Sequence, residues 1–378
     1  MAKGRMWPAE FRDYEDPLSG AHVRQLTSYK GNSHHLYFTN PGWYAGGRKM
    51  LIGSDRDNRT NLFGIDLETG EIEQLTDLAP GNVGFLGVSV NPTREEAYFR
   101  HNREVKAVDL ETRELRVLWE RPEGFRWSML NCTADGEFVC VGIYEDLSDR
   151  IRIDRNYIGF PEVWAAHPLS RIAKVAVDGS GGEIVWEEKT WIGHVNTSPT
   201  LANVLTFCHE GPWEMVDNRI WGFDLETQKA WKIRPREVEA ERVGHEYWHA
   251  DGIHLGYHGS RKDRPGFFGR IRYDGTDCEE FACKSQTGHI HSNDFSSIVG
   301  DGGQVIRIWK NAGDAFDGPR ILAEHRSSMH IQESHPHPRF TPDGRKVVYT
   351  SNFSGYCNVY LADVPEFDSL PSVEEDET

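Results

Sequence analysis

Seventeen histidines occur in the 378 residues, and several of them recur at a regular spacing. The series starts at His194 and continues at His245, His289 and His335, in successive steps of 51, 44 and 46 residues. Each of these histidines lies just before an apolar, strand-like segment. Equivalent positions in successive repeats of a closed fold lie on one ring, so we expect the side chains to converge at one end of a central channel. A single histidine is more often a surface or capping residue, but the shared phase argues against that interpretation.

The HPHP segment, residues 335–338, contains one histidine of this series and a second histidine two residues later. Its prolines keep the chain extended, so His335 and His337, two residues apart, face the same way. Together with His289 they supply three imidazoles, a common ligand set for a metal ion with an open coordination position. Gln332 lies just upstream and could add an amide oxygen. The sequence therefore predicts a metal site.

The segment HEYWH, residues 245–249, matches the H-E-x-x-H pattern of zinc proteases, but that chemistry needs a helix. Here the segment leads through Gly252 into a second apolar stretch, which favours a strand, a turn and a strand. We therefore interpret His245 as a base and His249 as a strand histidine. The sequence has no G-x-S-x-G elbow, no phosphate-binding glycine loop and no WD dipeptide.

The elements that position these residues repeat along the chain. An alternating apolar strand, an Asp, a turn and a second strand recur around Asp66, Asp109, Asp178, Asp224, Asp274 and Asp363, and residues 307–324 fit a seventh unit. A period of about 40 to 50 residues with Gly and Asp turns is typical of propeller blades. The one long step contains an insertion, residues 146–170, in which we expect a short helix.

The two ends of the sequence complement each other. Residues 21–29 look like an outer strand without inner partners, and residues 339–364 supply inner strands without an outer one. We therefore predict an all-β, seven-bladed β-propeller closed by an N-terminal strand that joins the C-terminal blade. Residues 1–378 form a single domain in this prediction, with the propeller over about 20–365 and an acidic tail at 366–378.

Composition limits the possible partners and the compartment. The net charge of −17 and the pI near 5.5 argue against nucleic acid and against an anionic membrane surface. The N-terminus lacks the apolar run of a signal peptide, and no stretch approaches the roughly 18 to 20 apolar residues of a membrane helix. Six cysteines show neither CxxC spacing nor the density of a disulfide scaffold. We therefore expect a cytoplasmic protein.

Five segments resemble, in the same order, blocks of the oligogalacturonate lyases. They are WIGHVNTSP, FCHEGPWEMVDNRIW, GHEYW, GHIHSND and QESHPHPRFTPDG. The repeats themselves resemble the TolB type, and the likeness covers roughly residues 20 to 365. It implies a seven-bladed propeller that binds manganese and cleaves short pectin oligomers by β-elimination in the cytoplasm.

The resemblance also implies a role for individual residues. The metal ligands fall on His289, Gln332, His335 and His337, the catalytic base on His245 and a supporting arginine on Arg219. A positive pocket of metal and arginine would also allow this acidic protein to bind an anionic sugar. Three imidazoles favour zinc, nickel or copper over manganese by intrinsic affinity, so another divalent ion is an alternative.

Four further histidines are predicted to contact the substrate: His34, His194, His209 and His291. Two of them mark departures from the family, because the first block here reads SHHLYF and because His291 replaces a usual thioether. Two alternatives to an oligogalacturonate lyase remain, and the divergent first block favours the first of them. One is a lyase for another oligosaccharide that contains uronate, and the other is a non-enzymatic, TolB-like binding propeller.

Overall fold

The recurring Asp of the sequence ends one strand and caps the turn into the next. The Oδ1 atom of Asp66 accepts the backbone N–H groups of Glu68 and Thr69, both at 3.0 Å. Asp109 and Asp224 make the same pair of contacts in their own turns. An Asp side chain that bonds to the backbone two and three residues further on stabilises such a turn. The predicted turns are confirmed at these positions, where they bring consecutive strands into antiparallel register.

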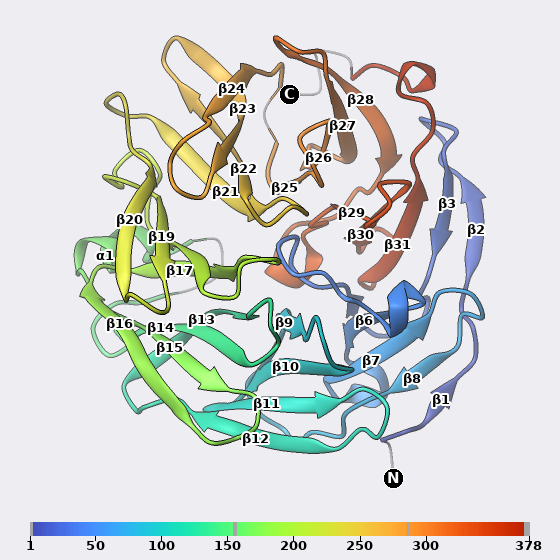
Figure 1. Ribbon diagram of the computed structural model, residues 1–378. Coiled ribbons are helices and arrows are strands. Elements are labelled where there is room, and N and C mark those ends of the chain that lie inside the picture. The colour runs from blue at the N-terminus through green and yellow to red at the C-terminus, as the bar shows by residue number, and fades with distance from the viewer. Residues whose placement is uncertain (1–2, 154–156, 286, 374–378) are drawn as a thin grey trace. The chain divides into compact units, whose positions relative to one another are not determined.

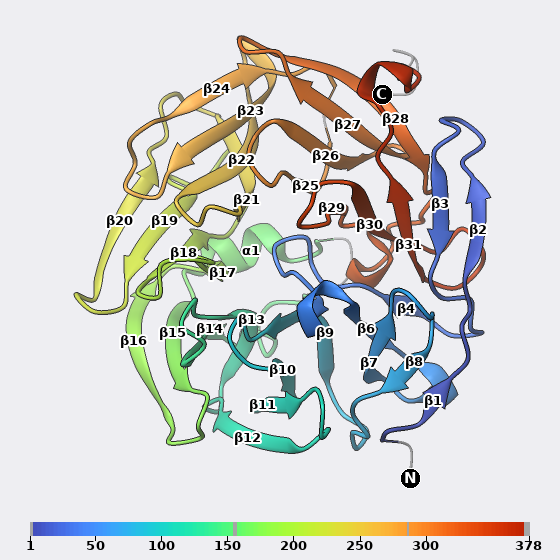
Figure 2. The same ribbon diagram turned by 45° about the vertical axis from the view of Figure 1, so that its right-hand side comes forward.

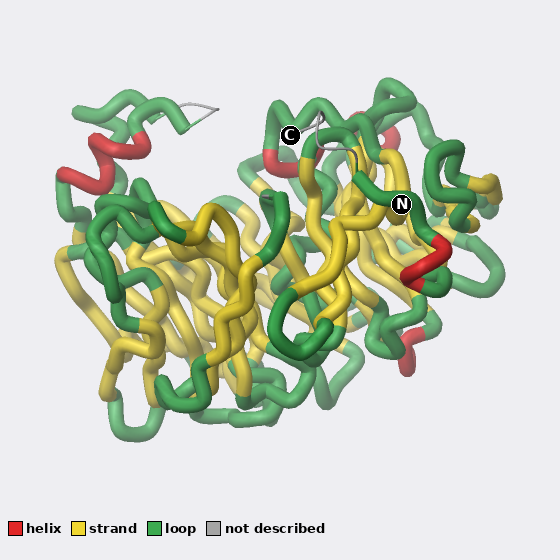
Figure 3. The backbone as a smooth tube through the Cα atoms, turned by 90° about the horizontal axis from the view of Figure 1, so that it is seen from above, coloured by secondary structure: helices red, strands yellow, loops and turns green. Residues whose placement is uncertain are grey.

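The computed structural model describes residues 3–153, 157–285 and 287–373. Figure 3 shows that strands and loops make up almost all of this part of the chain. None of its helices is long and apolar enough to cross a membrane. The predicted short helix in the insertion of residues 146–170 is confirmed. The helical segments are α1 (Phe160–Ala165), η1 (Ala45–Gly47), η2 (Arg56–Asn58), η3 (Gln332–Ser334) and η4 (Phe367–Ser369).

The described residues form seven antiparallel sheets, which confirms the predicted all-β, seven-bladed propeller. By its contacts the chain divides into two compact units. The first unit comprises residues 1–86, 266–268 and 281–378, and the second comprises residues 87–265 and 269–280.

The first unit contains three sheets. In one of them the strands pair in the order β1 (Met6–Trp7), β8 (Ile72–Gln74), β7 (Asn61–Asp66), β6 (Lys49–Ser54) and β4 (Ser33–His34), with β5 (Trp43–Tyr44) beside β6. In the next the order is β2 (Arg12–Glu15), β3 (His22–Gln25), β31 (Asn358–Asp363), β30 (Lys346–Ser351) and β29 (Arg339–Phe340). In the third it is β25 (Ile290–His291), β26 (Ser297–Gly302), β27 (Val305–Asn311) and β28 (Phe316–Glu324), so the predicted seventh repeat is confirmed.

The second unit contains most of the other four sheets, each with strands paired in chain order. They are β9 (Val83–Val90), β10 (Glu96–His101), β11 (Glu104–Asp109) and β12 (Leu115–Glu120); β13 (Phe125–Cys132), β14 (Phe138–Glu145), β15 (Leu169–Ala176) and β16 (Gly182–Lys189); β17 (Ile192–Thr197), β18 (Val204–His209), β19 (Ile220–Asp224) and β20 (Lys229–Arg234); and β21 (Arg242–Trp248), β22 (His254–Arg261), β23 (Arg264–Arg272) and β24 (Glu279–Ala282). Parts of β9, β23 and β24 belong to the first unit.

The two ends of the chain share one sheet of the first unit. Strand β3 pairs antiparallel with β31, and Figures 1 and 2 show β2 and β3 in blue alongside β31 in red. The hydroxyl of Thr27 also donates to Asn358 Oδ1 at 3.0 Å. The predicted closure by an N-terminal strand is therefore confirmed. Strands β1 and β2 lie upstream of residue 20, where the sequence predicted no strand. Of the predicted acidic tail, residues 374–378 lie outside the described residues.

Apolar side chains from neighbouring strands fill the space between the sheets of the first unit. Phe63, Ile65 and Ile72 pack with Val359 of β31 in one fully buried cluster. Alternate residues of each strand point into such clusters, as the period of a strand requires. Because each sheet buries its faces only against its neighbours, the loops at the strand ends are left to carry function.

All six cysteines are described, and none is bonded to another. Cys132, Cys140, Cys208 and Cys357 are buried. Burial raises the pKa of the Cys140 thiol to about 12 and that of Cys357 to about 11. These two thiols therefore stay protonated and pack as small apolar side chains.

Candidate metal centre and active site

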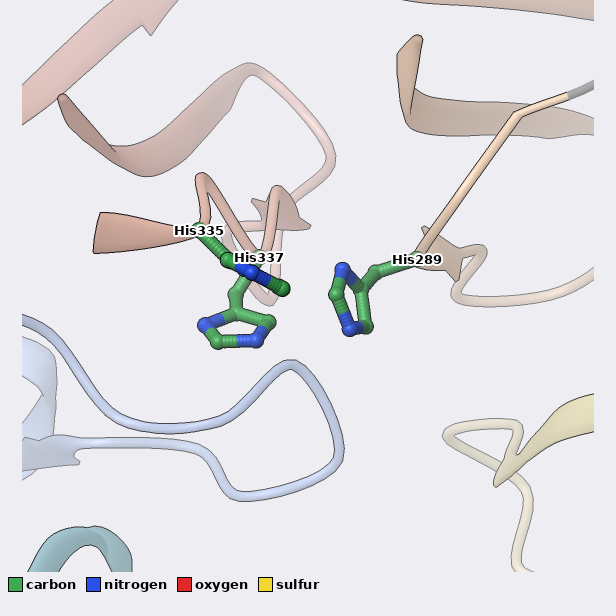
Figure 4. A group of neighbouring side chains, drawn as sticks. All are labelled: His289, His335 and His337. Carbon is green, nitrogen blue, oxygen red and sulfur yellow. The ribbon is translucent and has the colours of Figure 1, made fainter. Parts of the chain in front are cut away.

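Three histidines of the first unit lie together, as the sequence predicted (Figure 4). His289 precedes β25, whereas His335 and His337 come from the HPHP segment that follows η3. One nitrogen of each ring lies within 4.8 Å of one nitrogen of the other two. The ring centroids of His289 and His337 are 4.2 Å apart. This spacing suits a single ion bound by three imidazoles.

Each histidine is held in a way that suits metal binding. Asp301 in β26 accepts hydrogen bonds from His289 at two atoms, from Nδ1 to Oδ2 at 2.8 Å and from the backbone N–H to Oδ1 at 2.6 Å. His335 Nε2 donates to the carbonyl of Met329 at 3.0 Å. Within the described part of the chain, His335 Nδ1 and His337 Nε2 are buried without a hydrogen-bond partner. Buried nitrogens of this kind, with a carboxylate behind a neighbouring ring, are typical of metal ligands.

The electrostatics keep two of the imidazoles neutral, the form that binds metal. Burial lowers the pKa of His335, and the nearby His289 lowers it further. Burial holds the pKa of His337 well below its ordinary value, with the same effect from His289. Burial raises the pKa of Asp301, but the charge and hydrogen bonds of His289 outweigh it and leave that pKa below its usual range. Asp301 therefore stays ionised and orients His289.

The SHHLYF block forms a wall of this cluster. The ring of Tyr37 lies edge-on to His337 with centroids 4.7 Å apart, and Phe38 lies 5.4 Å from His289. His35 Nε2 is 2.9 Å from the carbonyl of Pro336, and burial lowers the pKa of His35 to about 4. His34 is buried too, with Nδ1 2.8 Å from its neighbour's carbonyl. Its predicted contact with substrate stays a prediction.

Gln332 and His291 lie close in sequence to the three clustered histidines but are not part of that cluster. Gln332 is exposed at the start of η3, where its carbonyl accepts the backbone N–H of His335 at 3.1 Å. The side chain of His291 is buried, and its Nδ1 accepts the N–H of Phe340 at 3.3 Å. The predicted roles of Gln332 as a ligand and His291 as a substrate contact stay predictions.

The second unit places His194 and His245 in equivalent β-bulges. The register of β17 and β18 shifts between Gly193 and Asn196, and that of β21 and β22 shifts between Gly244 and Tyr247. Both histidines have a positive φ, 45° and 52°. Bulges re-aim side chains near active sites, and such backbone strain collects at functional positions. The strand conformation of this segment also confirms that HEYWH is not the helix of a zinc protease.

Arg219 is the centre of a buried charge cluster. Its Nε donates to Glu246 and its Nη1 to Glu210, both at 3.0 Å. The two ring nitrogens of His194 each lie 3.7 Å from one of these carboxylates. Burial by itself lowers the pKa of Arg219, but its neighbours Cys208, Glu246 and Glu210 hold it well above its ordinary value. Burial raises the pKa of Glu210, but Arg219 and His194 outweigh it, so that pKa is lowered. The guanidinium is therefore charged and rigidly oriented.

His245 is paired with a second histidine, His258 of β22. Its Nδ1 lies 2.8 Å from His258 Nε2, and the two rings stack at a centroid distance of 5.1 Å. The indole of Trp213 lies edge-on to His245 at 5.0 Å and also beneath the guanidinium of Arg219 at 5.4 Å. Whether Nδ1 of His245 or Nε2 of His258 donates depends on the tautomer of each ring. Trp213 thus contacts both His245 and Arg219.

His209, predicted to contact substrate, lies at the end of β18 with other partners. Its Nε2 is 3.0 Å from Glu188 Oε1, and its ring stacks on Trp221 with centroids 4.7 Å apart. These contacts link three strands of the second unit. The contact with substrate stays a prediction.

Three supporting residues were not predicted from the sequence: Asp301, Glu246 and His258. In the sequence Asp301 lies in the Gly-rich run GDGG and looks like one more turn residue, whereas the structure places it within β26. Glu246 belongs to the HEYWH segment, where the protease pattern suggested a different role. The spacing of 13 residues between His245 and His258 could have indicated a cross-strand pair across a hairpin, provided that the bulge was known.

The fold and the three-histidine cluster define a β-propeller with the ligand set of a metal centre. A family profile described as oligogalacturonate lyase matches residues 1–368. The chain therefore belongs to the oligogalacturonate lyase family. This confirms the family that the motifs resemble, and with it a lyase that acts on oligosaccharides.

Individual relatives agree over the full length. The oligogalacturonide lyase of Pectobacterium atrosepticum is 28% identical and the oligogalacturonate lyase of Dickeya dadantii 27% identical, each over 97% of this chain and 99% of its own. A solved oligogalacturonate lyase in complex with manganese superposes with a TM-score of 0.88 at 27% identity, covering 97% of this chain and 99% of that one. The Vibrio parahaemolyticus oligogalacturonate lyase gives a TM-score of 0.87 at 26% identity with the same coverage.

Proposed function

We propose that this lyase cleaves short oligogalacturonates by a metal-dependent β-elimination in which His245 is the base. The observation that carries the proposal is the three-histidine cluster, in which the buried nitrogens of His335 and His337 face His289 without another partner among the described residues. A propeller that only binds a ligand has no need for such a cluster together with a paired histidine base. We therefore favour the enzyme over the binding propeller.

The reaction removes the proton next to the uronate carboxylate and expels the sugar linked at the neighbouring carbon. When bound, a divalent ion supplies Lewis-acid stabilisation of the charge that develops on that carboxylate. His289, His335 and His337 would hold the ion, with Asp301 keeping the Nδ1 proton of His289 in place so that Nε2 is the ligand atom.

His245 takes the proton at Nε2, because its Nδ1 is engaged by His258. An imidazole with an ordinary pKa of about 6.5 is largely neutral at the pH of the cytoplasm and can accept a proton there. As His245 becomes cationic, its Nδ1–H donates more strongly to Nε2 of His258, which stabilises the new charge. His258 thereby sets the tautomer of the base and shares its proton.

Arg219 stabilises negative charge on the substrate through N–H groups other than the two that bind Glu210 and Glu246. Those two carboxylates fix the plane of the guanidinium, so the remaining donors need no reorganisation during the reaction. His194 completes the cluster between the same two carboxylates. In this proposal Glu210 and Glu246 hold the ring of His194 in place, and His194 contacts the sugar.

We also propose that the ion is manganese and that the protein works in the cytoplasm. The first proposal is supported by the related lyase that was solved with manganese. It runs against the intrinsic preference of three imidazoles for zinc, nickel or copper, so the availability of the ion in the cell has to decide. The second is supported by six cysteines, none of which is bonded to another.

Substitution of the base separates this function from binding alone. His245→Gln is expected to lose at least about 100-fold in kcat, as removal of a general base does, while manganese binding measured by calorimetry is unchanged. His254→Gln is the matched control, because His254 lies on β22 and pairs with Asp251 at the end of the same hairpin. Full activity in His245→Gln would refute the assignment of the base.

A further inference from the structure

Arg100 of the second unit has different surroundings from the arginines that pair with acidic side chains inside the protein. Arg56 pairs with Glu10, Arg219 with Glu210 and Glu246, and Arg234 with Glu241 and Glu280. Arg100, near the end of β10, has no carboxylate within ion-pair distance among the described residues. Its Nη1 donates instead to the backbone carbonyl of Ser128, and its Nε is shielded from solvent without a partner.

A charged arginine that is shielded from water and has no counter-ion raises the free energy of the folded protein. Moving a cation out of water without a counter-ion is unfavourable, and the penalty falls when an anion binds. Burial lowers the pKa of Arg100 to about 10, and Tyr144 opposes that effect. The guanidinium is therefore still charged at neutral pH, and no carboxylate of residues 3–153, 157–285 or 287–373 pairs with it.

Arg100 is anchored at a bulge equivalent to those that carry the candidate site. The register of β13 and β14 shifts between Trp127 and Leu130, and Ser128 lies within that shift. His194 and His245 occupy the corresponding shifts of β17 and β21, the first strands of the next two sheets. The hydrogen bond to Ser128 therefore brings the guanidinium to the same edge of the sheets as the two histidines.

Contacts between the strands show how close these bulges lie. A Cβ atom at Gly142 would be 3.0 Å from Ser128 Cβ and 2.9 Å from Val195 Cγ2, so Ser128 and Val195, the residue that follows His194, both lie against this glycine. A Cβ at Gly87 would lie 3.3 Å from Arg100 Nη2, so the glycine leaves room for the guanidinium.

The surroundings of Arg100 suit an anionic sugar. Arg126 lies opposite Tyr144 in the register of β13 and β14. Burial raises the pKa of Tyr144, with smaller effects from Arg126 and Arg100, which lower it, and from Asp146 and Glu210, which raise it. The ring of Tyr144 lies 5.6 Å from that of Trp191, which in turn is 4.9 Å from Phe160. Cationic groups beside an aromatic wall can bind a carboxylate and pack against the apolar face of a sugar ring.

We propose that Arg100 binds the carboxylate of a second uronate residue, in the sugar next to the one from which His245 removes a proton. The proposal rests on the proposed lyase function. The charge of Arg219 is offset by two glutamates, whereas no acid in the part of the chain that the structure describes pairs with Arg100. Arg100 therefore supplies local positive charge that an enzyme of net charge −17 needs for a substrate with a carboxylate on every residue.

The test compares Arg100→Gln with wild type on two substrates, digalacturonate and the same disaccharide with the carboxylate of the second residue reduced to an alcohol. On digalacturonate the variant is expected to raise KM about 10- to 100-fold, the effect of losing a charged hydrogen-bonded pair, with kcat within about 3-fold. On the reduced substrate wild type and variant should have the same, high KM. Arg100→Lys, which keeps the charge but loses the planar fork, should give an intermediate KM on digalacturonate.

Arg103→Gln is the matched control, because Arg103 lies just beyond β10 and pairs with Glu120 and Glu123 on the surface. It should leave KM unchanged on both substrates. An unchanged KM in Arg100→Gln, or an equal rise on both substrates, would overturn the proposal. If wild type forms no unsaturated product from digalacturonate, the proposed function fails instead, so the two failures are distinguishable. Thermal unfolding of each variant shows whether it is folded, and if Arg100→Gln is not, Arg100→Lys decides by the same comparison.

Discussion

Replacement of Asp301 by Asn tests the metal centre without touching a ligand. The carboxylate of Asp301 accepts two hydrogen bonds from His289, at 2.6 Å from the backbone and at 2.8 Å from Nδ1. An Asn has only one acceptor oxygen. If that oxygen keeps the backbone N–H, the amide NH₂ faces Nδ1 and favours the tautomer in which Nδ1 accepts and Nε2 carries the proton.

That tautomer blocks the nitrogen that would bind the ion, so metal affinity must fall. The loss of a partner behind a metal-binding histidine typically costs 10- to 100-fold, or about 1.4 to 2.8 kcal/mol of binding free energy. We therefore expect the manganese Kd of Asp301→Asn to rise by about this factor, with a parallel rise in the metal concentration that gives half-maximal activity.

Isothermal titration of manganese into metal-free protein measures this directly, with competition against a chelator where binding is too tight. Asp294→Asn serves as the control, because Asp294 is exposed on the loop after β25 and, among the described residues, hydrogen bonds only to nearby Ser292 and Ser296. A Kd for Asp301→Asn equal to that of wild type would refute the assignment of His289 as a ligand held by Asp301.

Three further results are expected. His258→Phe keeps the stacked ring but removes the hydrogen bond, so kcat should fall roughly 10-fold and the acidic limb of kcat/KM should move to lower pH, a shift that a purely structural role would not produce. Glu246→Gln removes one of the two carboxylates that hold Arg219, so the free energy of unfolding in urea should fall by about 2 kcal/mol, and an unchanged midpoint would contradict that role. Burial lowers the pKa of His35 and of His325 to about 4, so the folded state binds fewer protons than the unfolded state between pH 6.5 and 4. The free energy of unfolding of the metal-free protein should therefore be highest above pH 6.5 and fall by about 3 kcal/mol for each histidine as the pH drops to 4. A free energy of unfolding that stays constant across this range would exclude the effect.

Much of the fold could be predicted because its signals are local and repeated. The Asp of each turn bonds to residues two and three positions away, so the sequence alone contains the whole interaction. The closure of the chain was also predictable, since residues 21–29 matched an outer strand that the C-terminal repeat lacked. The first two strands were not predicted, because β1 and β2 are short and lack a clear alternating pattern.

The ligand cluster was predictable for a similar reason. His335 and His337 are two residues apart in an extended segment, and His289 has the same phase in the preceding repeat. The contacts that orient these side chains were not predictable in this way. The hydrogen bond that His289 donates to Asp301 depends on how β25 and β26 pair across the turn between them. Many carboxylates near turns lie at a similar sequence distance from a histidine, so the sequence does not single out Asp301.

The base and its partners show the same limit. The resemblance indicated His245 and Arg219, but their environment depends on a bulge that aims His245 at His258 and on the burial of Glu246. A shift of one residue in that register would turn each side chain to the other face of the sheet. The alternation of a strand can be read from its own residues, whereas the position of the bulge requires the paired strand.

The central claim is metal-dependent elimination on a galacturonate oligomer. It is tested most directly by the ultraviolet absorbance of unsaturated uronate released from digalacturonate and trigalacturonate, first with manganese and then with an excess of chelator. We expect a steady rise in absorbance that the chelator abolishes and added manganese restores. Absence of the unsaturated product from protein shown to bind manganese, or release that the chelator does not affect, would contradict the account.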